Sequence, residues 1–147
     1  FSGNRNSDIE KRVEKAGNTM KLCIDDAGTS LDNIDLISAN GNSGKLSDLL
    51  EARAIKELFG EKGEEIPVHT IKSTLGESYG ASGAAQTASA LLSISNDLVP
   101  PTINCDKKDP ECNLNIVSEK LEKEVNTVLI NSFDLSGNNS CLVVKKV

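Results

Sequence analysis

The sequence predicts a layered α/β fold. Helix-like and strand-like segments alternate along the first two thirds of the chain, one of these helices carries no charged residue, and two alternating apolar runs close the sequence. Alternation of strands and helices is typical of helices packed against a sheet. A helix without charges is expected to be covered on both faces, so we expect sheets on both sides of it.

The first two elements are an amphipathic helix and a short strand. Ser7-Asp8-Ile9-Glu10 has the pattern of a capping box, apolar residues recur at helical spacing behind it, and Gly28 offers a stop. Residues 34–39 are expected to form a buried strand that leads into the glycine-rich loop 40–44.

The middle of the chain continues the alternation. A second helix is expected from near Ser47 to just before Gly60, followed by a strand over residues 67–71. The segment 81–95 is the uncharged third helix, rich in small residues. Residues 98–104 contain two consecutive prolines and must therefore be extended or looped.

The last third of the chain begins with a polar segment and ends in strands. Residues 106–115 are polar and turn-like. Residues 127–133 and 140–147 alternate apolar side chains and are joined by a Gly-Asn-Asn turn at 137–139, so we expect a hairpin of two strands.

Length and charge limit the function classes. A chain of 147 residues suits one domain, and its net charge of −6, with both signs interspersed, does not favour nucleic acid as a partner. The uncharged run 78–96 contains serines and Gln86, so we expect a buried helix rather than a membrane span. The first residues lack the apolar core of a signal peptide, and the missing initiator Met suggests a piece of a longer protein.

The cysteines predict no metal site and no disulfide framework. None of them forms a C-x-x-C pair, and the single histidine, His69, is remote from them in sequence. We therefore expect four reduced thiols in a cytoplasmic protein. They are Cys23, Cys105, Cys112 and Cys141.

Two loops carry a resemblance to a known family. The first is Ser38-Ala39-Asn40-Gly41-Asn42-Ser43-Gly44, with Asp48 and Glu51 after it, and the second is Ile71-Lys72-Ser73-Thr74-Leu75-Gly76-Glu77. They resemble the active-site loops of β-ketoacyl synthases, the condensing enzymes of fatty acid and polyketide synthesis, which read roughly A-H-G-T-x-T-x-x-x-D-x-x-E and K-S-x-x-G-H. Both histidine positions are changed here, to Asn40 and Glu77.

Further matches follow in the family's order along nearly the whole chain. Residues 80–84 are similar to its G-A-A-G-A segment, 99–104 to I-P-P-T-I-N, 109–112 to D-P-E-C and 131–133 to N-S-F. The chain is thus identified as a member of the family. The resemblance implies that residues 1–147 are the C-terminal half of a thiolase-like fold, layered αβαβα, and a fragment of a longer protein. The nucleophilic cysteine then lies in the N-terminal half, and none of the four cysteines here takes its role.

The resemblance also implies what the two substitutions do. In a condensing enzyme the two histidines donate N–H groups to the thioester oxygen of malonyl-carrier protein as that oxygen becomes negative. Asn40 could still donate one amide N–H, whereas the carboxylate of Glu77 would repel the charge unless burial kept it protonated. We therefore do not expect ordinary Claisen condensation at this site.

The remaining family positions are supporting residues. Lys72 matches the active-site lysine and Glu51 the acidic residue of the first loop, and an ion pair between them could hold the loops without any chemistry. Asp48 could simply cap the second helix. After Phe133 the family's G-F-G-G is replaced, which places Leu135 at the gate of the acyl pocket and indicates an altered or closed pocket. His69 is expected to be an ordinary strand histidine.

The function implied is that of a catalytically degenerate partner subunit, similar to the chain-length factors of type II polyketide systems. The expected partners are acyl carrier protein, the missing N-terminal half, and an intact ketosynthase or a second copy, with no membrane, cofactor or metal. The alternative is an active β-ketoacyl-carrier-protein synthase or malonyl-carrier-protein decarboxylase with an unusual donor set. A separate module that binds carrier protein is a third reading.

Overall fold

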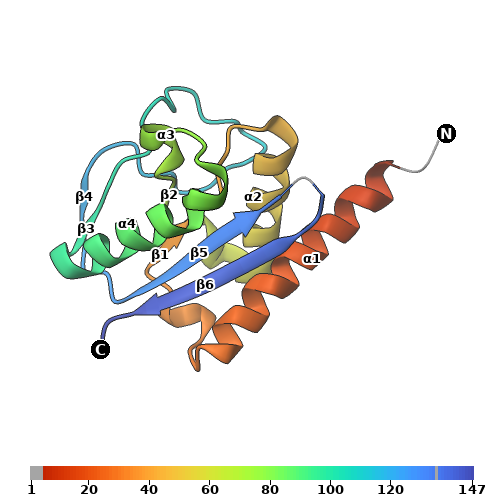
Figure 1. Cartoon of the computed structure of the whole chain (residues 1–147). Helices are drawn as coiled ribbons and strands as arrows, with labels where there is room; N and C mark the ends of the chain where they lie inside the picture. Colours follow the sequence, from red (N-terminus) through yellow and green to blue (C-terminus); the bar gives the residue numbers. More distant parts are fainter. Residues whose placement is uncertain (1–4, 135) are drawn as a thin grey trace.

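The computed structural model describes residues 5–134 and 136–147, and its centre is a four-stranded mixed sheet (Figure 1). The strand order is β2-β1-β5-β6. β1 runs parallel to both β2 and β5, whereas β6 pairs with β5 in antiparallel register, with Leu129 opposite Val143. The predicted α/β fold with a C-terminal hairpin is confirmed. The strands are β1 (Leu36–Ser38), β2 (Val68–His69), β5 (Thr127–Phe133) and β6 (Asn139–Lys145).

Helices cover both faces of this sheet. α1 (Arg5–Asp26) and α2 (Lys45–Phe59) pack on one face, and α4 (Ser82–Asn96) packs on the other (Figure 1). Along β5, Leu129 joins the core under α1 and α2, while Val128 and Ile130 join the core under α4. This alternation is the two-residue period of a strand that is buried on both faces.

Gln86 ties the two inner strands together from α4. Its buried side-chain amide donates to the carbonyl of Ala39, 3.0 Å away, and to the carbonyl of Asn131, 3.1 Å away. The side-chain NH₂ group of this central residue of the helix is therefore satisfied by backbone carbonyls of the sheet region, whereas its Oε1 has no partner among the described residues.

The helix α4 differs from the expectation of sheets on both sides. Ala90 and Ile94 are buried against the sheet, but Leu91 and Leu92 on the other side are 50% and 64% exposed. Among the described residues, the only other sheet is the ribbon of β3 (Leu98–Val99) with β4 (Leu121–Glu122), which pairs antiparallel; Val99 shares a core with Ala90 and Ile94, but Leu91 and Leu92 stay exposed. The side of α4 that carries Leu91 and Leu92 is therefore an apolar surface that the described residues leave uncovered.

The helix boundaries agree with the sequence except at the start of α1. This helix begins at Arg5, so Ser7 lies inside its first turn and not at a cap. Nothing between Arg5 and Ser7 breaks a helix, since the segment has no proline or glycine. The predicted stop at Gly28 fits a positive φ of 60° there.

Short elements complete the chain. They are the 3-10 turns η1 (Leu31–Asn33), η2 (Gly60–Glu64) and η3 (Tyr79–Ala81), and the one-turn helix α3 (Lys72–Leu75). In the described part of the chain, no helix is both long enough and apolar enough to span a membrane.

Candidate active site

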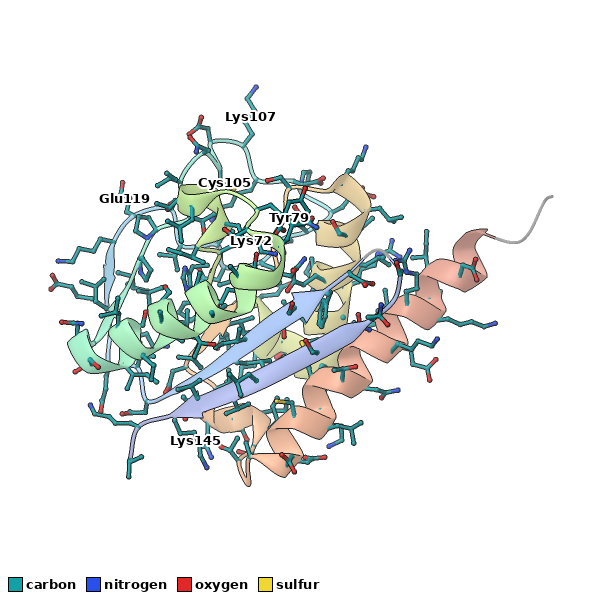
Figure 2. All side chains as sticks on the ribbon, in the orientation of Figure 1. Lys72, Tyr79, Cys105, Lys107, Glu119 and Lys145 are labelled. Atoms are coloured by element: carbon teal, nitrogen blue, oxygen red, sulfur yellow. The ribbon has the colours of Figure 1, made fainter. Side chains whose placement is uncertain are left out.

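The two loops singled out in the sequence lie beside each other because their strands do. β1 and β2 are parallel neighbours, with Ser38 opposite His69, so the segments that leave their carboxyl ends emerge together. Thr70 links them, because its hydroxyl contacts the Gly41 carbonyl at 3.4 Å and accepts from the Lys72 N–H at 3.3 Å. Figure 2 shows Lys72 near Tyr79 in the upper half of the view, well away from Lys145 near the bottom.

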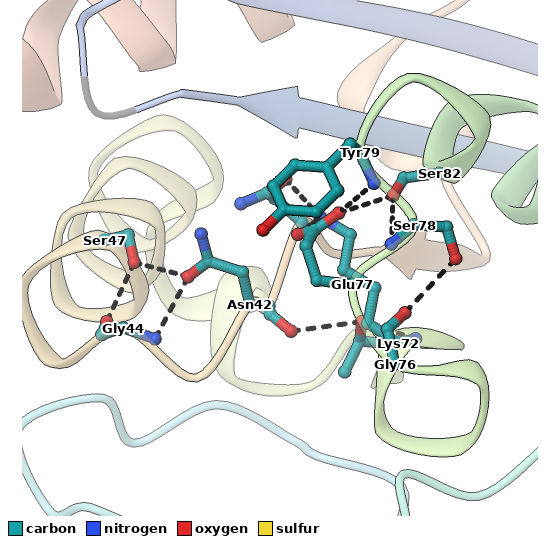
Figure 3. A network of polar contacts seen from close by, with 12 residues as sticks. Asn42, Gly44, Ser47, Lys72, Gly76, Glu77, Ser78, Tyr79 and Ser82 are labelled. Atoms are coloured by element: carbon teal, nitrogen blue, oxygen red, sulfur yellow. Dashed lines mark hydrogen bonds and ion pairs between the residues drawn. The ribbon is translucent and has the colours of Figure 1, made fainter.

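Lys72 joins Asn40 and Glu77, the two residues that the sequence analysis compared with the family's histidines. Its ammonium donates to Asn40 Oδ1 at 2.8 Å and pairs with Glu77 Oε2 at 3.0 Å. The side chain of Lys72 is only 7% exposed, whereas that of Glu77 is 35% exposed. Asn40 and Glu77, which are far apart in sequence, therefore share one buried cation. Figure 3 shows Lys72 beside Glu77.

Glu77 is held as an anion. Its Oε1 accepts from the hydroxyl of Ser82 at 2.6 Å and from the backbone N–H of Tyr79 at 2.9 Å (Figure 3). The bond from Ser82, together with Lys72, lowers the pKa of this carboxyl below its ordinary value. Burial does not keep it protonated, so the condition under which Glu77 could donate a hydrogen bond is not met.

Glu51 lies under the first loop and does not pair with Lys72. Its carboxylate accepts from the backbone N–H groups of Asn40 at 2.8 Å and Gly41 at 3.0 Å, and from the side-chain amide of Asn131 at 3.0 Å. Burial raises its pKa, and these three bonds oppose that rise. The expected ion pair between Glu51 and Lys72 is wrong, because the turn after α3 brings Glu77 to the ammonium instead.

The N-cap of α2 is Gly44, and neither Asp48 nor Asn42 makes a side-chain capping bond to the helix; Asn42 instead holds the turn that precedes it. Asn42 Oδ1 accepts from the Gly44 N–H at 3.0 Å and from the Ser47 hydroxyl at 2.6 Å (Figure 3). Asp48 lies within the helix. The predicted capping role of Asp48 is therefore wrong. The pattern that indicates Asn42 is an asparagine two residues before a glycine, which is typical of an Asx turn.

Gly41 is required by its neighbour. Its φ is +37°, and a Cβ atom there would lie 2.9 Å from Cβ of Thr70. No side chain fits in that space without moving the second loop, so the glycine fixes how closely the two loops approach.

The gate residues are only partly described. Phe133 is half-buried at the end of β5 and lines a cavity of about 330 Å³ together with Leu50 and Glu51. Arg12 and Lys15 of α1 line the same cavity, a contribution that sequence reasoning missed because surface charges on a helix carry no such signal. Leu135, the expected gate, lies outside the described residues.

The cysteines are thiols in this structure. Burial raises the pKa of Cys23, Cys112 and Cys141, which keeps these groups protonated near neutral pH. All four cysteines are free. Among the described residues, no group of three or more His, Cys, Asp or Glu side chains could hold a metal ion.

Comparison with known proteins gives one family. The family described as "Beta-ketoacyl synthase, C-terminal domain" matches residues 1–106. The 3-oxoacyl-[acyl-carrier-protein] synthase 2 of Coxiella burnetii is 40% identical over 129 residues, which are 87% of this chain and 31% of that protein. The protein of the same name from Staphylococcus aureus is 36% identical over 134 residues, 90% of this chain and 32% of the relative.

Solved structures agree with the sequence relatives. The structure described as the ishigamide ketosynthase/chain length factor matches with a TM-score of 0.86 and 34% identity, over 90% of this chain and 32% of that one. A type II PKS acyl-carrier protein in complex with its ketosynthase matches with a TM-score of 0.87 and 31% identity, over 90% of this chain and 33% of that one. The chain thus spans about a third of the length of the proteins it resembles.

Proposed function

The chain belongs to the beta-ketoacyl synthase family, whose C-terminal domain it matches, and within this family we propose that it is part of a subunit that does not itself condense acyl chains. In this proposal the whole of residues 1–147 forms the C-terminal domain. The protein that contains it pairs with an intact ketosynthase and helps to shape the acyl pocket, in the manner of a chain-length factor.

The observation that carries this proposal is the position of Lys72 between Asn40 and Glu77. A condensing site needs hydrogen-bond donors aimed at the oxygen that becomes negative as CO₂ leaves. Here the amide oxygen of Asn40 points to the ammonium, and Glu77 is a carboxylate. Removing one such donor costs about 2.7–4 kcal/mol of transition-state stabilisation, and an anion in place of a second donor adds repulsion.

The proposed partners are acyl carrier protein and an intact ketosynthase or a second copy. The uncovered apolar side of α4, with Leu91 and Leu92, supports tight pairing with further polypeptide, including the family's N-terminal half. Fatty acid or polyketide synthesis is the pathway class that this assignment implies.

An active enzyme is the second candidate. The sequence relatives named as 3-oxoacyl-[acyl-carrier-protein] synthase 2 favour it, and so does the retained cation of Lys72. In that case the protein would be a β-ketoacyl synthase or a malonyl-carrier-protein decarboxylase that uses an unusual set of donors.

One assay separates these candidates. The whole protein is incubated with malonyl-carrier protein, and CO₂ release and chain extension are followed with and without an intact ketosynthase. We expect neither product from the protein alone and an altered product length from the pair. Condensation by the protein alone would overturn the proposal, and CO₂ release without condensation would favour the decarboxylase.

A further inference from the structure

Tyr79 has a strained backbone at the edge of the candidate active site. Its φ is +48°, in the left-handed region, although the residue is not a glycine and Gly80 follows it directly. A bulky side chain is rare in this region, and such strain is kept where the surroundings impose it, most often at binding and catalytic sites. The conformation therefore marks Tyr79 as a candidate functional residue.

The contacts that impose this conformation come from the site itself. The backbone N–H of Tyr79 donates to Glu77 Oε1 at 2.9 Å. Glu77 is fixed in turn by the Lys72 ammonium at 3.0 Å and by the Ser82 hydroxyl at 2.6 Å. Through this one carboxylate, the position of Tyr79 is tied to that of Lys72.

The side chain of Tyr79 is presented to its surroundings instead of being packed in the core. Tyr79 is 86% exposed, whereas Asn40 and Lys72 are buried and Glu77 is only partly exposed. Figures 2 and 3 both show Tyr79 next to Lys72. The ring is thus the outermost group of this network and stands at the approach to Lys72.

The surroundings of the ring suit an apolar ligand. The segment 78–90 has no charged residue, and Tyr79 is its one aromatic residue among mainly small side chains. Lys72 and Glu77 compensate each other's charge, so a charged ligand would gain little from them. An aromatic ring offers a large, rigid and apolar face.

We propose that the Tyr79 ring lies against the acyl chain of the thioester that enters this site, and that Tyr79 thereby helps to determine which acyl chains are accepted. This inference rests on the proposed function, from which the acyl ligand comes. It requires no condensation step, because a partner subunit that shapes the pocket and an active enzyme would both contact the chain. Its test can therefore fail or succeed independently of the condensation assay.

Fluorine NMR of the whole protein, labelled with fluorotyrosine, tests the contact. Tyr79 is the single tyrosine of residues 1–147, and its signal is assigned by its loss in Tyr79→Phe. The protein is titrated with decanoyl-pantetheine and with unacylated pantetheine, each with and without an intact ketosynthase. We expect a saturable shift with decanoyl-pantetheine and none with pantetheine. No saturable shift in any titration, or equal shifts with both probes, would overturn the inference, because the ring would then not meet the acyl chain.

Three variants separate a ligand contact from a structural role. Tyr79→Gly removes the ring and relieves the strain, so it should unfold at the same or a higher urea concentration while binding decanoyl-pantetheine about ten-fold more weakly in calorimetric titration. Tyr79→Phe keeps the ring and should bind as the unmodified protein does. Leu22→Ala, at a position of α1 that is 69% exposed, should change neither property. Lower stability of Tyr79→Gly, or unchanged affinity, would contradict a ligand role for the ring.

Discussion

The buried ammonium of Lys72 lies 3.0 Å from the carboxylate of Glu77, and this pair organises the candidate active site. The ammonium of Lys72 is almost fully buried, whereas the carboxylate of Glu77 is partly exposed and accepts a hydrogen bond from the Ser82 hydroxyl. Glu77, which sequence reasoning compared with a family histidine, thus makes a structural contact. Substitutions of Glu77 should therefore show whether this contact supports stability, activity or both.

Glu77→Ala should destabilise the fold through Lys72. The variant leaves a buried ammonium with Asn40 Oδ1 as its remaining partner, and an incompletely satisfied buried charge costs about 1–3 kcal/mol or more. The measurement is the free energy of unfolding from urea denaturation at neutral pH.

The matched control for that loss is Glu122→Ala. Glu122 also pairs with a lysine, Lys120, at 2.9 Å, but both side chains are well exposed, so little change is expected. If the two variants had equal effects, the Lys72–Glu77 pair would have no special role in stability.

His69 predicts a loss of stability in weak acid. Burial lowers its folded pKa to about 4 from an ordinary value of 6.5, so the unfolded chain binds more protons between these values. Stability from neutral His69 is therefore present above about pH 6.5 and is lost as the pH falls toward 4. Between pH 7 and pH 5 the loss amounts to about 2 kcal/mol.

Comparison with His69→Phe isolates this effect. Asp48 and Glu51 have raised pKa values and contribute with the opposite sign, but they are present in both proteins. The difference in unfolding free energy between pH 7 and pH 5 should therefore be larger in the unmodified protein by that amount. An equal change in unfolding free energy in the two proteins would show that the His69 ring takes up a proton in the folded protein as it does in the unfolded chain.

The larger elements were predictable because each follows a periodic pattern. The helices α1, α2 and α4 and the β5–β6 hairpin are long enough for apolar spacing to identify them. β4 and α3 have two and four residues, too few for any period to show. The covering of α4 was overestimated, because the absence of charge predicts an apolar surface but not which layer lies against it.

The residues that meet at the site were predictable from the sequence, but their hydrogen bonds and ion pairs were not. Sequence reasoning brought Asn40, Lys72 and Glu77 to one place, and the structure joins them. It paired the lysine with Glu51, because spacing in sequence does not show which of two acids a turn will present. The bonds of Glu51 go to backbone N–H groups, which every residue has and which therefore leave no mark in a sequence.

Glu51→Gln should loosen the first loop. The variant replaces one carboxylate oxygen by an amide that is itself a donor, so it leaves a buried N–H of Asn40 or Gly41 without an acceptor. We expect a loss of about 1–3 kcal/mol in unfolding free energy and faster hydrogen exchange at the amides of Asn40 and Gly41.

The control for this variant is Glu57→Gln, on the exposed side of the same helix. It makes the same chemical change without touching the loop, so exchange at Asn40 and Gly41 should stay as in the unmodified protein. Protection of these amides in Glu51→Gln would mean that the loop is held by other contacts.

Activity gives the last prediction, because the proposed partner role and a catalytic role differ in what Glu77→Gln does. The variant removes the charge and keeps the size and one acceptor oxygen, so the contact with Lys72 can persist. If this chain only shapes the pocket, condensation by its complex with an intact ketosynthase should keep its rate. Replacing a loop histidine of that ketosynthase by alanine should lower the rate about 10²–10³-fold, because an oxyanion donor is lost there. The measurement is chain extension from malonyl-carrier protein by the two complexes at equal concentration. A comparable fall in both would place Glu77 in the reaction itself and favour the active-enzyme candidate.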